Sequence, residues 1–294
     1  MPTPLRFDPV EVFSVSSLAH LPRSFQLNTT PIYHRALLIR LLTGNLNFRC
    51  TVTNQVTKQR NDYSTLSFTS NNRANKSRIE SSVSCKINDI DSYVLSTANI
   101  NRVFYRELFH EYCSFFHQNQ NRNHVVAFLH LYRILERIAY CLPLMWAARA
   151  NDYEKTFTQL KSYFSEPKIG ELGVLKKFIQ DSIDITFRQV SITISVNSIH
   201  SDWQKNHYNS IKSSIPTGGV VAESQYSSIT TNYEFITELT IKIRNGYFHA
   251  LTGAANSFSS EQIVDSNEFF RAINEPIVNW LSFLLFQIIE HEIK

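Results

Sequence analysis

Apolar residues recur at helical spacing over most of the chain after residue 100. The clearest segment alternates spacings of three and four, which places one apolar stripe along a helix: Phe128, Leu131, Leu135, Ile138, Leu142 and Met145. Similar patterns predict helices over residues 100–117, 152–164, 172–183 and 201–211, with Pro167 as a helix break. Two long helices are predicted at the end, one over about residues 231–251 and one starting near Pro276.

The first third of the chain has a different period. A short helix is predicted over residues 32–42 and ends at Gly44, which tolerates positive φ. Every second residue is then apolar in the run Leu46, Phe48, Cys50 and Val52, and a second run is formed by Ile79, Val83, Cys85 and Ile87. We therefore expect a small antiparallel sheet over about residues 46–88 with a basic loop at 70–77. Residues 185–196 are rich in β-branched side chains and predict an inserted hairpin or an extended linker.

These patterns predict a mainly α protein with two regions: an α+β region over residues 1–99 and a helical region over residues 100–294. Hydrophobic residues make up 43% of the chain, enough to bury a core. The four cysteines are dispersed without a C-x-x-C pair, which favours reduced core thiols over a disulfide framework or a zinc site. No signal peptide and no uninterrupted apolar span are recognisable, so we expect a soluble, cytoplasmic protein without a membrane partner.

The net charge of +4 is unevenly distributed. Residues 1–119 hold 13 Lys and Arg against 8 Asp and Glu, whereas the rest holds 16 against 17. A positive surplus in the front region can steer or bind a polyanion, although a solvated basic face is the commoner explanation.

The candidate chemistry lies in the segment from Ile241 to His249. It contains Arg244, a polar residue directly after it (Asn245), and a histidine five positions after the arginine (His249). Arg244 is the only arginine of the chain with a histidine at that spacing. The segment resembles the R-[N/D/H]-x₃-H form of the R-x₄₋₆-H motif of HEPN domains, in the same context of a late helix followed by one more long apolar helix. The resemblance covers roughly residues 120–294, and the segment 131–137 looks like the first helix of such a bundle.

The resemblance implies a metal-independent and cofactor-independent endoribonuclease. RNA carries its own nucleophile, the 2′-hydroxyl, so cleavage needs positioning, proton transfer and charge stabilisation. A histidine titrates near neutral pH and can move a proton, and a guanidinium can hold two phosphate oxygens. Asn245 would then fix Arg244 or the scissile phosphate. The structural alternative is that Arg244 pairs with a surface carboxylate while His249 caps a helix end.

Helical geometry adds a constraint. Five residues turn an α-helix by about 500°, which leaves the Arg244 and His249 side chains roughly 140° apart. Either the helix distorts near Gly246, or two copies share one site. In HEPN proteins the motifs of two protomers meet at a dimer interface, so the resemblance implies a homodimer with one composite site. HEPN toxins regulated by a nucleotidyltransferase often carry Tyr two residues after the histidine, where this chain has Leu251.

Weaker site candidates come from the surrounding sequence. Glu136 could contact the active-site arginine or be a plain solvated carboxylate, and Tyr247 could be a core residue or stack on substrate. The basic loop with Arg73, Lys76 and Arg78 could bind the RNA backbone or be an ordinary solvated loop. His110, His117, His124 and His130 lack Cys or acidic partners at ligand spacing, so we expect core or helix-surface positions.

The sequence contains neither a Gly-rich phosphate loop nor a G-x-S-x-G elbow, which argues against ATP-driven and serine-hydrolase functions. By family analogy we expect an RNA-cleaving effector of prokaryotic defence or toxin systems, with RNA and an inhibitor or activator protein as partners. The region 1–99 would then sense a signal, help to select the RNA substrate or restrain the nuclease. The alternative is a non-catalytic HEPN-like module that binds nucleotide, RNA or a protein.

Overall fold

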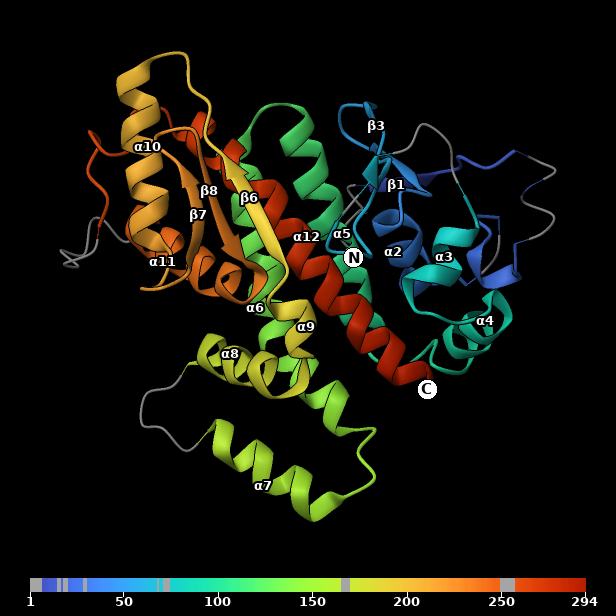
Figure 1. Cartoon of the computed structure of the whole chain (residues 1–294). Coiled ribbons are helices and arrows are strands. Elements are labelled where there is room, and N and C mark those ends of the chain that lie inside the picture. Colours follow the sequence, from blue (N-terminus) through green and yellow to red (C-terminus); the bar gives the residue numbers. More distant parts are fainter. Residues whose placement is uncertain are drawn as a thin grey trace.

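The protein is mainly helical, with three small antiparallel sheets (Figure 1). The computed structural model describes residues 7–14, 17, 21–28, 31–67, 69–70, 75–164, 170–248 and 257–294. Its helices are α2 (His34–Leu42), α3 (Ser77–Ser82), α4 (Ile87–Ser96), α5 (Arg102–Gln120), α6 (His124–Ala147), α7 (Tyr153–Tyr163), α8 (Glu171–Ser182), α9 (Ile185–Arg188), α10 (Ser201–Ser214), α11 (Ile236–Phe248) and α12 (Ser266–Ile293), with 3₁₀ turns η1 (Arg23–Phe25) and η2 (Tyr233–Phe235).

The strands form three separate sheets. The first has the order β1-β2-β3, the second pairs β4 with β5, and the third has the order β6-β8-β7. Within the third sheet the register shifts between Val220 and Ala222, where β7 carries an irregularity. The strands are β1 (Phe7–Val10), β2 (Asn47–Cys50), β3 (Val56–Thr57), β4 (Asn61–Asp62), β5 (Thr69–Ser70), β6 (Ser191–Ser195), β7 (Val220–Ser224) and β8 (Ser228–Asn232).

The helix α12 runs through the middle of the molecule (Figure 1). It packs along α6, which also packs along α5, and the hydroxyls of Ser282 on α12 and Tyr112 on α5 lie 3.4 Å apart. In Figure 1 the front region with α2, α3 and α4 lies on one side of α12, and the third sheet with α10 and α11 lies on the other. The pair α7 and α8 extends from the end of α6. Buried apolar side chains from all these regions belong to one continuous core, which crosses the expected boundary at residue 99 without a break.

The stripe predicted on α6 is buried, as expected from its spacing. All six of its members, from Phe128 to Met145, are at most 5% exposed. Among the described helices, α12 is the one long and apolar enough to cross a membrane, yet most of its apolar window is buried inside the fold. That is the position of a core helix.

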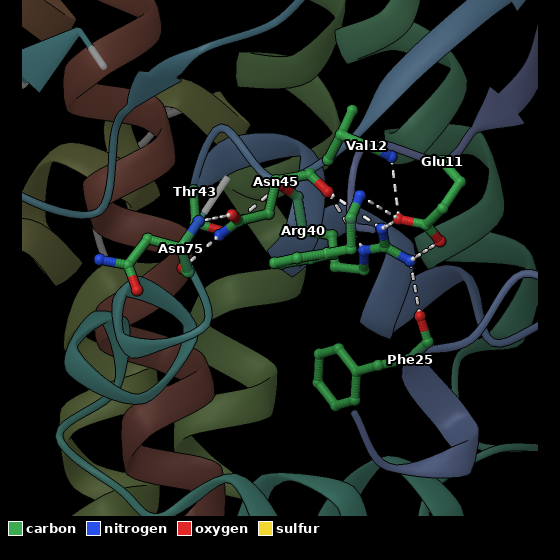
Figure 2. Close-up of polar contacts among 8 residues, drawn as sticks. Glu11, Val12, Phe25, Arg40, Thr43, Asn45 and Asn75 are labelled. Carbon is green, nitrogen blue, oxygen red and sulfur yellow. Dashed lines mark hydrogen bonds and ion pairs between the residues drawn. The ribbon is translucent and has the colours of Figure 1, made fainter. Parts of the chain in front are cut away.

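The front region is organised around the buried side chain of Arg40 (Figure 2). Its guanidinium donates to the backbone carbonyl of Asn45 from Nε and Nη2, at 3.2 and 3.1 Å, and to the carbonyl of Phe25 from Nη1 at 2.6 Å. The carboxylate of Glu11 pairs with the same guanidinium. The side chain of Asn45 continues the network to Thr43 and to the backbone of Asn75. These bonds tie η1, the end of α2 and the start of α3 together.

Three expectations about the elements are wrong. The run from Ile79 to Ile87 forms α3 and the start of α4, because its buried side chains continue at helical spacing through Ile90 and Val94. The helix expected from residue 231 begins at Ile236, after the strands β7 and β8, which the pattern did not indicate. The last helix begins at Ser266, and Pro276 lies inside it.

Other expectations are confirmed in part. The helix over 32–42 ends before Gly44, whose φ is +71° and whose absent Cβ would meet the carbonyl oxygen of Arg60. The segment 185–196 splits into the short helix α9 and the strand β6. The predicted helix break at Pro167 and part of the basic loop, residues 71–74, lie outside the described residues.

Candidate functional site

The helix α11 presents the motif segment on the outer side of the bundle. Its inner face buries Ile236, Leu239 and Ile243, and Thr237 accepts a hydrogen bond from the indole nitrogen of Trp280 on α12 at 3.0 Å. Arg244 is half-buried and Asn245 is exposed. The alternation of buried and accessible positions therefore directs these two polar side chains away from the core.

Arg244 lies over the ring of Tyr132, a buried residue of α6. The guanidinium carbon is 4.7 Å from the ring centroid, and Nη1 donates to Oδ1 of Asn245 at 3.1 Å. A guanidinium is attracted to the electron-rich face of an aromatic ring, and the contact fixes the plane of the group. Asn245 thus orients Arg244, one of the two roles expected for it.

Carboxylates complete the cluster around Tyr132. Glu136, one helical turn further along α6, is exposed and lies close enough for its charge to act on the phenol of Tyr132. Burial raises the pKa of the Tyr132 hydroxyl, the nearby charge of Arg244 lowers it, and the charges of Glu136 and Glu171 raise it. The helices α6 and α11 therefore bring Glu136 and Arg244 close enough to Tyr132 for their opposite charges to act on its hydroxyl.

We call Tyr132, Glu136, Arg244 and Asn245 the Arg244 cluster. Of its members, Tyr132 was missed by the sequence reasoning, although its position four residues before Glu136 puts both on one face of the helix. Chemically, the cluster offers a planar, permanently charged group of fixed orientation, which suits recognition of a phosphate or carboxylate through two parallel hydrogen bonds.

Tyr247 occupies a core position. Its ring packs edge-on against Phe270 of α12 at a centroid distance of 4.9 Å, and its hydroxyl hydrogen-bonds Oγ of Ser266 at 2.8 Å. Of the two interpretations offered for this residue, the packing supports the structural one. Tyr247 joins the end of α11 to the start of α12.

His249, the second residue of the motif, and Leu251 lie outside the described residues, as does Arg73. Lys76 is half-exposed just before α3. Arg78 is only 7% exposed, and its guanidinium donates to the backbone carbonyl of Thr43 at 3.3 Å. Arg78 is therefore unavailable to an RNA backbone, because the side chain is committed to the interior. The helices α3 and α11 also lie on opposite sides of α12 (Figure 1), so the structure does not bring this part of the front region to the Arg244 cluster.

The four clustered histidines occupy core and helix-surface positions. His117 contacts Thr57 at 3.2 Å, His124 contacts Asn119 at 2.8 Å, and His130 contacts Glu111 at 2.7 Å. His110 is half-buried against Phe109 and His34. Within the described part of the chain, no three His, Cys, Asp or Glu side chains gather at metal-binding distance. The four cysteines are free thiols.

No known protein family model, curated protein or solved structure matches this chain. The functional assignment therefore depends on the chemistry of the Arg244 cluster and on the motif that contains it.

Proposed function

We propose that the chain is an HEPN-type endoribonuclease that cleaves RNA without a metal ion and uses Arg244 and His249 as catalytic residues. The observation that carries the proposal is the orientation of the Arg244 guanidinium by Tyr132 and Asn245, at the end of a helix that leads directly into His249. The packing of α5, α6, α11 and α12 into a helical bundle further supports it, because the motif lies near the end of the last helix but one.

The reaction is an internal transesterification. The 2′-oxygen attacks the neighbouring phosphorus, the bond from phosphorus to the 5′-oxygen breaks, and the products carry a 2′,3′-cyclic phosphate and a 5′-hydroxyl. The 2′-hydroxyl loses one proton and the leaving oxygen gains one, and His249 imidazoles transfer both. Arg244 stabilises the negative charge on the non-bridging oxygens as the five-coordinate phosphorus forms.

In this proposal two copies of the chain form a homodimer that surrounds one phosphodiester. One His249 accepts the proton and its symmetry mate delivers the other, and both copies of Arg244 contribute charge. The front region, residues 1–99, senses a signal or restrains the nuclease in the cytoplasm, as part of a defence or toxin system with a regulatory partner protein. Light scattering after gel filtration tests the dimer.

The central experiment incubates the purified protein with total RNA in EDTA. Wild type should cleave and leave cyclic phosphates, whereas Arg244→Ala and His249→Ala should lose activity by about 10²–10³-fold, the typical effect of removing a group that stabilises transition-state charge. Arg133→Ala is the matched control, because Arg133 is an arginine of α6 whose side chain is 61% exposed and contacts Glu111. Equal cleavage by all variants would contradict the proposal. A wild type inert in every RNA mixture would favour the non-catalytic module.

A further inference from the structure

A separate cavity of about 590 Å³ lies along the second half of α12. Five parts of the chain contribute to its lining: residues 64–67, residues 81–84 at the end of α3, the end of α6, the segment 182–190, and α12 itself. Volumes of 300–1,000 Å³ are typical of sites for small organic molecules. Phe270, which contacts Tyr247, and Gln287, which lines the cavity, lie about 25 Å apart along α12 at 1.5 Å per residue. The cavity is therefore distinct from the Arg244 cluster.

Aromatic rings form one side of the cavity. Phe187 is 39% exposed there and packs against the buried Phe283 at a centroid distance of 5.1 Å. At the other end, the rings of Trp146 and His291 stack at 3.7 Å with an angle of 7° between their planes. An exposed phenylalanine beside a cavity offers a face on which a planar ring can stack, and stacking of a base on an aromatic side chain stabilises binding by about 1–3 kcal/mol.

Two polar groups of α12 have no partner at this site. The side-chain amide of Gln287 makes no hydrogen bond to any part of the chain that the structure describes, and Nε2 of His291 is buried without one. A buried polar atom without a partner costs free energy, which a ligand recovers by bonding to it. A glutamine amide offers one donor and one acceptor side by side, the arrangement that pairs with the amino group and adjacent ring nitrogen of adenine.

The charge of the lining indicates whether the ligand carries a phosphate. Among the described residues, Lys294 is the only Lys or Arg that lines the cavity, and its ammonium pairs with the carboxylate of Glu290. A phosphate chain would find no cluster of cations there. The lining instead includes several hydroxyl side chains, among them the exposed Ser67 and Ser84, which suit the hydroxyls of a ribose.

From these features we propose that the cavity binds an uncharged purine nucleoside with a 6-amino group, that is, adenosine. The base stacks on Phe187 and pairs with Gln287, and the ribose faces the serine hydroxyls. This site lies beyond the proposed nuclease function and does not depend on it.

Calorimetric titration of the full-length protein with adenosine tests the proposal. We expect saturable binding that weakens at least tenfold in Gln287→Leu and in Phe187→Ala. Gln189→Leu is the matched control, because Gln189 is exposed two residues after Phe187 and does not line the cavity. Inosine, which carries an oxygen in place of the 6-amino group, should bind at least tenfold more weakly than adenosine, and AMP should bind no more tightly.

The outcomes separate this site from the nuclease. Arg244→Ala should bind adenosine like wild type, whatever its effect on RNA cleavage. Melting temperatures identify any variant that fails to fold, and the inosine comparison needs only the wild type. An absence of adenosine binding at millimolar concentration, equal binding by Gln287→Leu, or equal affinity for inosine would each overturn the proposal.

Discussion

Arg40 and Arg244 are both arginines on helices, yet the protein holds them in opposite ways. Arg40 is fully buried, and backbone carbonyls and the Glu11 carboxylate accept hydrogen bonds from its N–H groups (Figure 2). Arg244 is half-buried and rests on the face of a tyrosine ring beside the side chain of its neighbour Asn245. The first arrangement uses the guanidinium to join segments of the fold. The second holds the guanidinium against an aromatic ring close to the surface.

The largest effect is expected for Arg40→Met. The substitution leaves Glu11 and two carbonyls without their donor, so we expect the free energy of unfolding to fall by about 3–5 kcal/mol. Denaturant titration measures this. Arg106→Met is the control, because the Arg106 side chain is 44% exposed and its ion pair is with the neighbouring residue Glu107. It should cost less than about 1 kcal/mol. Equal losses for the two variants would mean that the buried network does not stabilise the fold.

Arg244→Lys tests the other side of the comparison. Lysine keeps the charge but loses the planar fork, so we expect RNA cleavage to fall about 100-fold. The free energy of unfolding should fall less than for Arg40→Met, because Arg244 is only half-buried and lysine keeps its positive charge. A loss of stability as large as that of Arg40→Met would show that Arg244, too, is mainly structural.

The front region should also respond to acid through His34. Burial first, and then the charges of His110, Arg106 and Arg102, lower the pKa of His34 to about 4. The unfolded chain binds the proton more readily, so the stability contributed by neutral His34 is complete above pH 6.5 and is lost as the pH falls toward 4. His34→Gln should lose less stability than wild type between pH 7 and pH 5 in denaturant titrations. Parallel losses in both proteins would contradict this assignment.

The smallest effect is expected at the start of α12. Asp265 caps this helix by accepting a hydrogen bond from the backbone of Glu268 at 2.9 Å. Asp265→Ala should cost about 1 kcal/mol, whereas Asp265→Asn, which keeps the cap, should cost less. Thermal unfolding of the two variants measures the difference. An equal cost in both would mean that the cap bond contributes nothing.

The fold could be predicted where the apolar pattern was long and regular. The α6 stripe succeeds because its six members repeat at helical spacing and are all buried. The strand predicted over residues 79–87 is wrong because a short run with spacings of two and four fits either a strand or a helix. The burial of Ile90 and Val94 favours the helix. The strand β8 is rich in Ser and Thr and β7 is mostly exposed, so Ile229 is the one fully buried apolar residue of the two strands.

The site was predictable only within one helix. The spacing of Arg244 and His249 is a local feature, and so is the position of Asn245. The ring that orients Arg244 comes from α6, far away in sequence, and only packing brings it there. The start of α12 was missed because Pro276 was interpreted as a first-turn residue. The capping signal is Asp265 followed by Glu268 three residues later.

The irregular strand β7 has a consequence for the solubility of the molecule. The third sheet has two outer strands, and α12 contacts one of them, β6. The other, β7, carries a break in register between Val220 and Ala222. A kinked edge presents no straight row of amide and carbonyl groups, so a neighbouring chain cannot extend the ladder. The irregularity thereby hinders aggregation through the β7 edge of the third sheet.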